Sequence, residues 1–462
     1  MATTFKTPGV YMEQVNLLLA VAPVATAIPA FVGYTEKIPA LISGSIPPVR
    51  ITSMLEYESI FGGPDRRVVA VLGAANTTVT SIVDYGAVHI LYYAVKLYFD
   101  NGGGPCYIAS AGIYPVAGAV QVSKPTLQAA IVLLESEDEP TLLVVPEATQ
   151  LASIISWADV SKDLLNQCAK LQDRFAILDT YERSSIVTEM NDFRSNIGTQ
   201  NLKYGAAYYP RLNTAIPYQY EASDNAVIHV QLVSLAYKSI TAALVADITP
   251  GMVTTIKAAI ADQNFGARTM TLPPSAAIAG IYASVDRTRG VWKAPANVSL
   301  TSVSAPALLL TNAEQEDLNV DSTTGKSINA IRSFTGKGIM VWGARTLDGN
   351  SNEWRYVSVR RLFILLEESI KKATQFVVFE PNDENSWLRV RNMAQNFLNG
   401  LWRQGALSGT KPEDAYFVNV GLGESMTAQD ILEGKLIIEI GVAAVRPAEF
   451  IVLRFMHKVQ QS

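Results

Sequence analysis

The segment around Gly325 has the residue types of a phosphate-binding loop. It reads TGKS at residues 324–327, so a lysine and a hydroxyl follow a glycine. A loop of this kind also needs a glycine five residues before Gly325, because its free backbone N–H groups must wrap the phosphates. Val320 occupies that position, and no obvious strand pattern precedes it. We therefore expect a glycine-containing turn and no nucleotide site.

The next glycine-rich stretch reads GKGIMVWG and ends at Gly343. A dinucleotide-binding fingerprint would need a glycine at Val341 and a helix after the glycines, whereas these glycines precede a strand pattern. We expect residues 339–342 to form the last strand of a sheet, with Gly343 at a turn where a side chain would be crowded. Arg345 then begins the connection to the C-terminal domain, where it should bind a carboxylate or backbone carbonyls. Trp342, Gly343 and Arg345 are thus predicted to form a joint between two domains.

The main enzymatic alternative is a Ser-His-Asp hydrolase. Asp179 ends a predicted strand, and His229 and Ser275 follow in an order that one class of serine protease uses. However, Ser275 lies behind two prolines in LPPSAAIAG, with no motif that would place a nucleophile at a helix start. His229 lies in an apolar run, where a packed histidine is the commoner case. The hydrolase stays the alternative to a non-enzymatic function.

Metal and cofactor chemistry find little support in the sequence. The two cysteines, Cys106 and Cys168, fit no metal spacing, and the chain has only three histidines, His89, His229 and His457. The acidic stretch ESEDEP at residues 135–140 is typical of a solvated loop, and nothing indicates the cleft that paired catalytic carboxylates need. We expect no metal, no cofactor and no catalytic centre.

The composition indicates a globular protein with a large core. Of the 462 residues, 49% are hydrophobic and 17% are charged, which favours two to four folded domains over disorder. The formal net charge of -5 argues against non-specific nucleic-acid binding. The apolar run at residues 17–34 imitates a signal peptide, but Pro23 and Pro29 interrupt it and Glu13 precedes it. We expect a product made in the cytoplasm, with no direct membrane insertion.

The middle of the chain alternates short apolar runs with helical patterns. A helical pattern at residues 83–99 ends at a glycine-rich break, and four strand patterns follow. They read CYIAS, TLLVVPE, RFAILDT and YGAAYYP, and helical patterns precede the second and the third. This order predicts β-α-β units and therefore an α/β fold with a doubly wound, mostly parallel sheet.

Two regions depart from this rhythm. Residues 221–265 are predicted to form an insertion with helices near residues 235–245 and 252–263. The C-terminal third predicts a helix that runs to Pro381, a second helix capped near Ser386, and strands at AYFVNVG and GKLIIEIGVAAV. The predicted parts are an N-terminal arm at 1–24, the N-terminal part of the body at 25–112, an α/β domain at 113–348, a C-terminal α+β domain at 349–446 and a C-terminal strand arm at 447–462.

Both ends of the chain carry strand patterns that need a partner. The final segment EFIVLRFMHKV is apolar on both faces of a strand, and such a strand must be buried. From the pattern alone, docking within the same subunit and strand addition to a neighbouring subunit are equally supported. The residues concerned are Val10, Tyr11, Met12 and Val15 in the N-terminal arm and Phe450, Ile451, Val452, Leu453 and Phe455 in the C-terminal arm.

Taken together and in order, segments along nearly the whole chain resemble the contractile tail sheath family, whose members jacket phage tails and phage-tail-like injection machines. The opening phrases are most similar to sheaths of extracellular injection particles. Arg211 departs from the family pattern, since many relatives have an aromatic residue there, and residues 221–265 are not a shared feature. The segments that carry the resemblance include TPGVYMEQV, AIPAFVGYTEK, YGAAYYPRL, LPPSAAIAGIYASVDRTRGVWKAPAN, INAIRSFTGKGIMVWGARTL, WRYVSVRRLFILLEESI and RPAEFIVLRF.

The resemblance implies a structural function. Sheath subunits stack as hexameric rings around an inner tube, in a phage tail or a phage-like particle, and the sleeve shortens to drive the tube through a target envelope. It also implies a subtilisin-like central domain without the catalytic triad, terminal arms that join a small sheet in neighbouring subunits, and baseplate and terminal cap proteins as further partners.

A basic helix in the C-terminal third suggests where the tube would bind. The pattern SWLRVRNMAQNFLNGLWRQ places Arg389, Arg391 and Arg403 beside an apolar stripe. A row of arginines could hold an acidic tube through several weak, salt-sensitive pairs. The alternative is a helix face that only meets water, which is the usual role of such charges.

Overall fold

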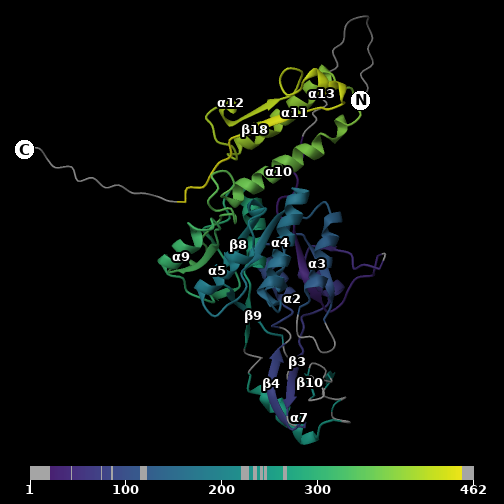
Figure 1. Cartoon of the computed structure of the whole chain (residues 1–462), viewed down its shortest axis with the longest axis vertical. Coiled ribbons are helices and arrows are strands. Elements are labelled where there is room, and N and C mark those ends of the chain that lie inside the picture. The colour runs from purple at the N-terminus through teal and green to yellow at the C-terminus, as the bar shows by residue number, and fades with distance from the viewer. Residues whose placement is uncertain are drawn as a thin grey trace, which may run out of the picture. The chain divides into compact units, whose positions relative to one another are not determined.

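The computed structural model describes residues 21–42, 44–73, 75–84, 87–114, 122–219, 228–232, 237–239, 243, 247–263 and 268–449. The described chain divides into two compact units. The larger unit spans Ala25–Leu365 and resumes at Arg446, and the smaller unit spans Leu366–Val445 and includes residues 21–24. Figure 1 shows the chain and its elements.

A nine-stranded sheet forms the centre of the larger unit. Its six central strands, in the order β5-β1-β6-β7-β8-β15, run parallel to one another, while β2, β16 and β13 pair antiparallel at its two edges. This sheet agrees with the mixed α/β, largely parallel fold that the sequence predicted. The strands are β1 (Pro29–Thr35), β2 (Val49–Ile51), β5 (Cys106–Ile113), β6 (Leu142–Val144), β7 (Phe175–Asp179), β8 (Gly205–Tyr209), β13 (Val298–Ser299), β15 (Asn329–Phe334) and β16 (Gly338–Val341).

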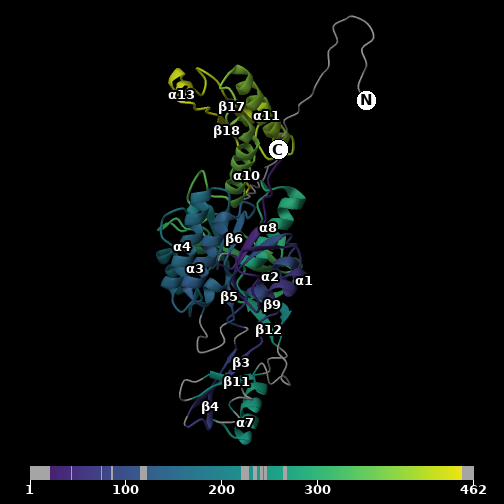
Figure 2. The same cartoon turned by 90° about the vertical axis from the view of Figure 1, so that its right-hand side faces the viewer.

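Helices cover both faces of this sheet, and the alternation of side chains explains why. In β7, Phe175 and Ile177 enter one apolar core, while Ala176 and Leu178 enter the other. In Figure 2, α2 and α8 lie on one side of β6, and α3 and α4 lie on the other. The helices of this layer are α1 (Met54–Phe61), α2 (Leu91–Asp100), α3 (Lys124–Leu133), α4 (Ile154–Leu171), α5 (Ile186–Asn196), α8 (Ser275–Arg289) and α9 (Asn312–Asn319).

Two smaller sheets complete the larger unit. A four-stranded sheet has the order β11-β10-β3-β4 and packs against α7 (Figure 1), and a three-stranded sheet has the order β12-β9-β14. The elements are β3 (Val68–Gly73), β4 (Thr78–Asp84), β9 (Leu212–Pro217), β10 (Ile228–Gln231), β11 (Tyr237–Ser239), α7 (Pro250–Ala261), β12 (Thr269–Leu272) and β14 (Val303–Pro306). Short 3-10 turns lie at Leu134–Ser136, Pro146–Gln150 and Leu202–Tyr204.

The smaller unit contains the second half of α10 (Val357–Ala373), which begins in the larger unit and crosses the boundary at Leu366. Its helix α11 packs against the strand β17, which pairs antiparallel with β18. The remaining elements of the unit are α11 (Glu384–Arg403), α12 (Pro412–Ala415), α13 (Ala428–Leu432), β17 (Tyr416–Asn419), β18 (Glu439–Val442) and a 3-10 turn at Gln375–Val377.

The structure corrects the prediction for residues 221–265. The helix predicted near residues 235–245 is wrong at residues 237–239, which form strand β11, whereas the second predicted helix is present as α7. Strand β10 pairs in parallel with β3, more than a hundred residues upstream. The inserted segment therefore completes a sheet with β3 and β4. A local period could not reveal this pairing, because the partner strand is distant in sequence.

Three helix limits also differ from the sequence prediction. Val83 lies in β4, and the following helix starts only at Leu91. Helix α10 ends at Ala373, before Pro381, and the turn between the two helices includes Phe379 with φ +70. The cap of α11 is Asp383 and not Ser386, because the Asp383 carboxylate accepts the Ser386 N–H at 2.9 Å.

Candidate functional site

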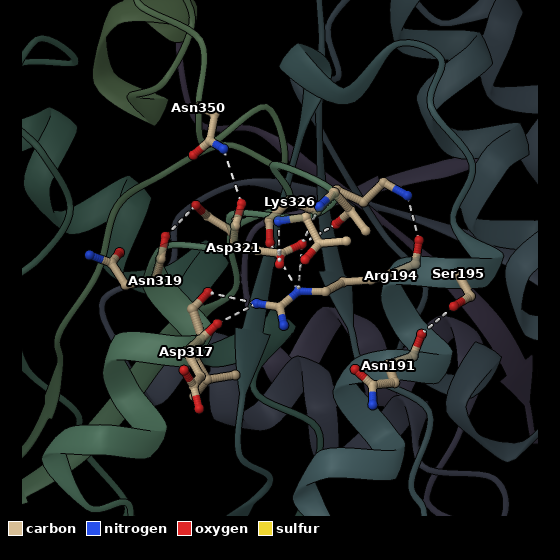
Figure 3. Close-up of polar contacts among 12 residues, drawn as sticks. Asn191, Arg194, Ser195, Asp317, Asn319, Asp321, Lys326 and Asn350 are labelled. Atoms are coloured by element: carbon tan, nitrogen blue, oxygen red, sulfur yellow. Dashed lines mark hydrogen bonds and ion pairs between the residues drawn. The ribbon is translucent and has the colours of Figure 1, made fainter.

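The TGKS segment forms a turn in which the lysine points into the protein. Gly325 has φ +74, and the Asp321 carboxylate accepts the N–H groups of Thr323 and Thr324 at 3.1 and 2.9 Å. The Lys326 ammonium is buried and donates to the backbone carbonyl of Arg194 in α5 (Figure 3). Burial lowers the pKa of Lys326. The prediction of a glycine-containing turn is confirmed. The lysine of this turn donates its hydrogen bond to a carbonyl inside the protein.

Arg194 ties this turn to helix α9. Its guanidinium donates to the carbonyl of Lys326 at 3.2 Å and to that of Asp317 at 2.5 Å, and it lies 3.6 Å from the Asp321 carboxylate. Figure 3 shows the arginine side chain between the turn and α9. Lys326 and Arg194 each donate to the other's backbone carbonyl, so the two side chains hold the turn against α5.

Asp179 and Ser275 meet in the core, where they form a helix cap. Ser275 is the first residue of α8, and both its N–H (2.8 Å) and its hydroxyl donate to the Asp179 carboxylate. Both residues are buried. Burial raises the pKa of Asp179 to about 7, although the hydrogen bonds from Ser275 act to lower it. The carboxylate therefore supplies the cap that Pro274, which precedes the helix, cannot provide.

His229 does not join this pair. It lies in β10 of the four-stranded sheet, in register with Val69 of β3 and Ser239 of β11, whereas Asp179 ends β7 of the nine-stranded sheet. The Ser275 hydroxyl donates to the carboxylate directly, where a catalytic triad requires an imidazole between them. The hydrolase alternative is therefore not supported by the geometry of the three residues.

Glu147 is a second buried carboxylate, and the sequence analysis did not single it out. It follows β6, its side chain is fully buried, and it accepts the N–H of Tyr34 at 2.8 Å and that of Leu91, the first residue of α2, at 3.1 Å. Burial raises the pKa of Glu147 to about 8, against these hydrogen bonds. The sequence signal was weak, since a glutamate after a strand is usually a loop residue.

The predicted joint is built around Asn329 of β15. The side-chain amide of Asn329 accepts the N–H of Arg345 at 2.7 Å and donates to the carbonyl of Arg345 at 2.8 Å. Gly343 packs so closely against it that a Cβ on Gly343 would lie 2.7 Å from Asn329 Oδ1. Trp342 contacts Phe334 with ring centroids 4.4 Å apart. The expectation that a side chain would be crowded at Gly343 is confirmed.

Arg345 finds both kinds of partner that the sequence predicted. Its guanidinium lies 2.6 Å from a carboxylate oxygen of Glu449 and donates to the carbonyls of Asn319 and Gly349 at 3.2 and 3.4 Å. The side chain is almost completely buried. A pocket of about 490 Å³ opens beside it, and Trp342, Gly343 and Glu449 contribute to its lining. The role of these residues as a joint between domains stays a prediction.

The three arginines of α11 have different environments. Arg391 lies 2.5 Å from the Glu424 carboxylate and also donates to the carbonyl of Val420. Arg389 is about half exposed and lies 3.7 Å from Glu380, and Arg403 is exposed. Arg389 and Arg403 are separated by about four helical turns and so share a face. Arg391 belongs to the packing of the smaller unit.

The predicted arm residues lie outside the described residues. This applies to Val10, Tyr11, Met12 and Val15 at the N-terminal end and to Phe450, Ile451, Val452, Leu453 and Phe455 at the C-terminal end. Within the described part of the chain, no group of three or more His, Cys, Asp or Glu side chains has the arrangement of a metal site. Among the same residues, no helix is both long and apolar enough to span a bilayer.

Comparison with known proteins places these features in a protein class. Residues 121–347 match the domain family described as phage tail sheath protein central domain, and residues 350–457 match the phage tail sheath C-terminal domain. The sheath of the extracellular contractile injection system PVC, in its contracted state, is 32% identical, with a TM-score of 0.66 and 99% of each chain covered. The contracted helical sheath of the anti-feeding prophage is also 32% identical, with a TM-score of 0.65, over 98% of this chain and all of that one.

Tail sheath proteins of phages are similar over shorter stretches. That of Vibrio phage KVP40 is 24% identical over 193 residues, which are 41% of this chain and 27% of the relative. That of Burkholderia phage BcepMu is 29% identical over 144 residues, which are 30% of each. The chain thus spans less than a third of the length of these curated relatives. On the full-length matches, the chain belongs to the phage tail sheath family.

Proposed function

We propose that this chain is the structural subunit of a contractile sheath. It polymerises as stacked hexameric rings around an inner tube, and the sleeve shortens to drive the tube through a target envelope. The observation that carries the proposal is the 32% identity over 99% of both chains to a sheath in its contracted state. The particle is a phage tail or a phage-like injection particle, assembled from subunits made in the cytoplasm, with an inner tube, a baseplate and a terminal cap as partners.

The proposed function is non-enzymatic. The residues that first suggested chemistry serve the fold: Lys326 binds a backbone carbonyl, and Ser275 caps a helix together with Asp179. The central domain is proposed to be subtilisin-like in fold, with the α/β domain at 113–348 and an α+β domain at 349–446. The six parallel strands of the nine-stranded sheet support the α/β class, and two of them, β1 and β5, come from the chain before residue 114.

Intersubunit strand addition is the proposed role of the terminal arms. The sheet of the smaller unit consists, among the described residues, of β17 and β18 alone. A two-stranded sheet is marginally stable, so further strands from neighbouring subunits would stabilise it. Backbone ladders of this kind would keep subunits connected while their side-chain contacts change during contraction.

The exposed face of α11 is the proposed tube-binding surface. Arg389 and Arg403 share this face, while Arg391 is held by Glu424 and by the Val420 carbonyl. Two exposed arginines per subunit would bind the tube only weakly. Because many subunits surround the tube in a sleeve, these weak contacts would add to a strong overall attachment. Such a contact would weaken with salt.

Truncation after Glu449 tests the proposal, because it removes residues 450–462 and leaves the described residues intact. The full chain should form sleeves that negative-stain electron microscopy detects, whereas the truncated chain should stay a folded subunit with an unchanged circular dichroism spectrum. Normal sleeves from the truncated chain would contradict the role of the arm. Hydrolytic turnover by the monomer, abolished in Ser275→Ala, would instead support the enzymatic alternative.

A further inference from the structure

Glu449, at the root of the C-terminal arm, is held by three side chains. One carboxylate oxygen accepts Asn319 Nδ2 and Arg345 Nε, each at 2.9 Å. The other accepts Arg345 Nη2 at 2.6 Å and the Tyr356 hydroxyl at 3.3 Å. Burial alone would raise the pKa of Glu449, but the hydrogen bonds from Arg345 and Asn319 outweigh it and lower the pKa. Glu449 is therefore ionised at neutral pH.

Arg345 is itself fixed to the centre of the nine-stranded sheet. Asn329 binds both backbone groups of Arg345, and the same amide nitrogen donates to the Ala207 carbonyl in β8 at 3.1 Å. Two nitrogens of the Arg345 guanidinium donate to the Glu449 carboxylate. This bidentate geometry fixes the orientation of the carboxylate as well as its distance from the arginine. A pull on Glu449 is thus transmitted through Arg345 to the body of the larger unit.

The chain passes between the units at three places, and two of them, at Leu366 and Arg446, are near this cluster in the sequence; the third is at Ala25. Tyr356 directly precedes α10, in which the chain enters the smaller unit at Leu366, and the chain re-enters the larger unit at Arg446, shortly before Glu449. The outgoing and the returning segments therefore share one fixed point in the larger unit. Residues 450–462 begin immediately after it.

We propose that Arg345 and Glu449 are positioning residues that clamp the root of the C-terminal arm and set where the arm leaves the body to reach a neighbouring subunit. This inference rests on the proposed function. A fixed root raises the effective concentration of the arm at the neighbour's sheet and removes part of the ordering cost of strand addition. The pair borders a pocket of about 490 Å³. A partly buried pair of this kind is weak evidence for stability and is better suited to fixing geometry.

The clamp is tested first in the monomer. Hydrogen–deuterium exchange of backbone amides in residues 443–449 should be faster in Glu449→Ala than in the wild type, with Glu449→Gln between them, because the amide keeps one acceptor and loses the charge. The control is Glu135→Ala, which removes a solvent-exposed pair with Lys170 (2.6 Å) far along the sequence. Equal exchange rates in the wild type and Glu449→Ala would overturn the proposal.

The positioning role is tested by the subunit concentration above which sleeves form. Losing a fixed root should raise this critical concentration about tenfold in Glu449→Ala and in Arg345→Lys, and sleeves should reappear at high concentration. Faster exchange with an unchanged critical concentration would overturn the proposal, since the pair would then only stabilise the subunit. If the wild-type chain forms no sleeves at all, the proposed function fails, and the exchange experiment still decides whether the clamp exists.

Discussion

Gly343 and Asn329 are in such close contact that no side chain fits between them. A Cβ on Gly343 would lie 2.7 Å from Asn329 Oδ1 and 3.2 Å from Asn329 Cα. The contact matters because Asn329 also binds both backbone groups of Arg345. One glycine therefore permits the arrangement that orients the arginine.

Gly343→Ala should destabilise the larger unit by about 1–3 kcal/mol, because the new methyl group displaces Asn329 from Arg345. Urea unfolding followed by tryptophan fluorescence measures the change. The matched control is Gly104→Ala, where an added Cβ would meet nothing within 4 Å. Equal unfolding midpoints for the two variants would contradict the crowding argument.

Asp179 should make the protein less stable as the pH rises from about 4 to about 7. Its pKa in the folded protein is about 7, against an ordinary value of 3.8, so the folded state keeps a proton that the unfolded state releases. The stability that protonated Asp179 contributes is fully present below about pH 4 and is lost between about pH 4 and about pH 7. The loss is at most about 1.4 kcal/mol per pH unit. Asp179→Asn removes the titration and keeps the cap on Ser275.

The comparison is between unfolding free energies of the wild type and Asp179→Asn from pH 4.5 to pH 8. The loss of unfolding free energy caused by Asp179→Asn should become smaller, or change sign, as the pH rises. The reason is that only the wild type must then bury a charged carboxylate. Parallel pH profiles would show that burial does not raise the pKa of Asp179.

Glu147→Gln should destabilise the protein by about 1–3 kcal/mol at pH 5, because an NH₂ group would face the N–H of Tyr34 or of Leu91 and leave a buried donor unsatisfied. The pKa of Glu147 in the folded protein is about 8, so the wild type loses stability between about pH 4.5 and pH 8. The difference in unfolding free energy between the wild type and Glu147→Gln should therefore become smaller over this pH range. Glu135→Gln, at a partly exposed position, is the control. A difference that widens as the pH rises would contradict the raised pKa of Glu147.

The arginines of α11 should separate into two classes. Arg391→Ala should lower the melting temperature of the smaller unit by a few degrees, equivalent to about 0.5–1 kcal/mol, because it loses Glu424 and the Val420 carbonyl. Arg389→Glu with Arg403→Glu should leave the melting temperature unchanged and reduce salt-sensitive binding to tubes of the same particle in co-sedimentation. If this double variant binds tubes as well as the wild type does, the proposal that this face of α11 binds the tube is wrong.

Local pattern was sufficient for the central layer and insufficient for pairings between distant segments. The runs that became β6, β7 and β8 are short, continuous and apolar, which is the pattern of strands buried on both faces. By contrast, β10 pairs with β3 across more than a hundred residues, and β11 was predicted to be helical. Edge and insertion strands have short and ambiguous patterns, so their structure depends on the partner.

The candidate site was predicted in part. Trp342, Gly343 and Arg345 were singled out from the sequence, and Arg345 was expected to bind a carboxylate or backbone carbonyls. The identity of that carboxylate, Glu449, could not be predicted, because it lies about a hundred residues downstream and the strand pattern treated it as the start of an arm. Glu147 was missed for a similar reason, since its helix-capping role depends on Leu91 in a different part of the chain.

The sequence by itself determined the α/β class, the missing glycine at Val320 that excludes a phosphate loop, and the resemblance to the sheath family, because these depend on local order and residue type. Only the tertiary structure decided what the charged residues do. It turned Lys326 toward a carbonyl of Arg194, made Asp179 a cap for Ser275, and joined Arg345 to Glu449. The physical reason is that burial forces each polar group to find a partner, and the fold, not the spacing along the chain, determines which partner is within reach.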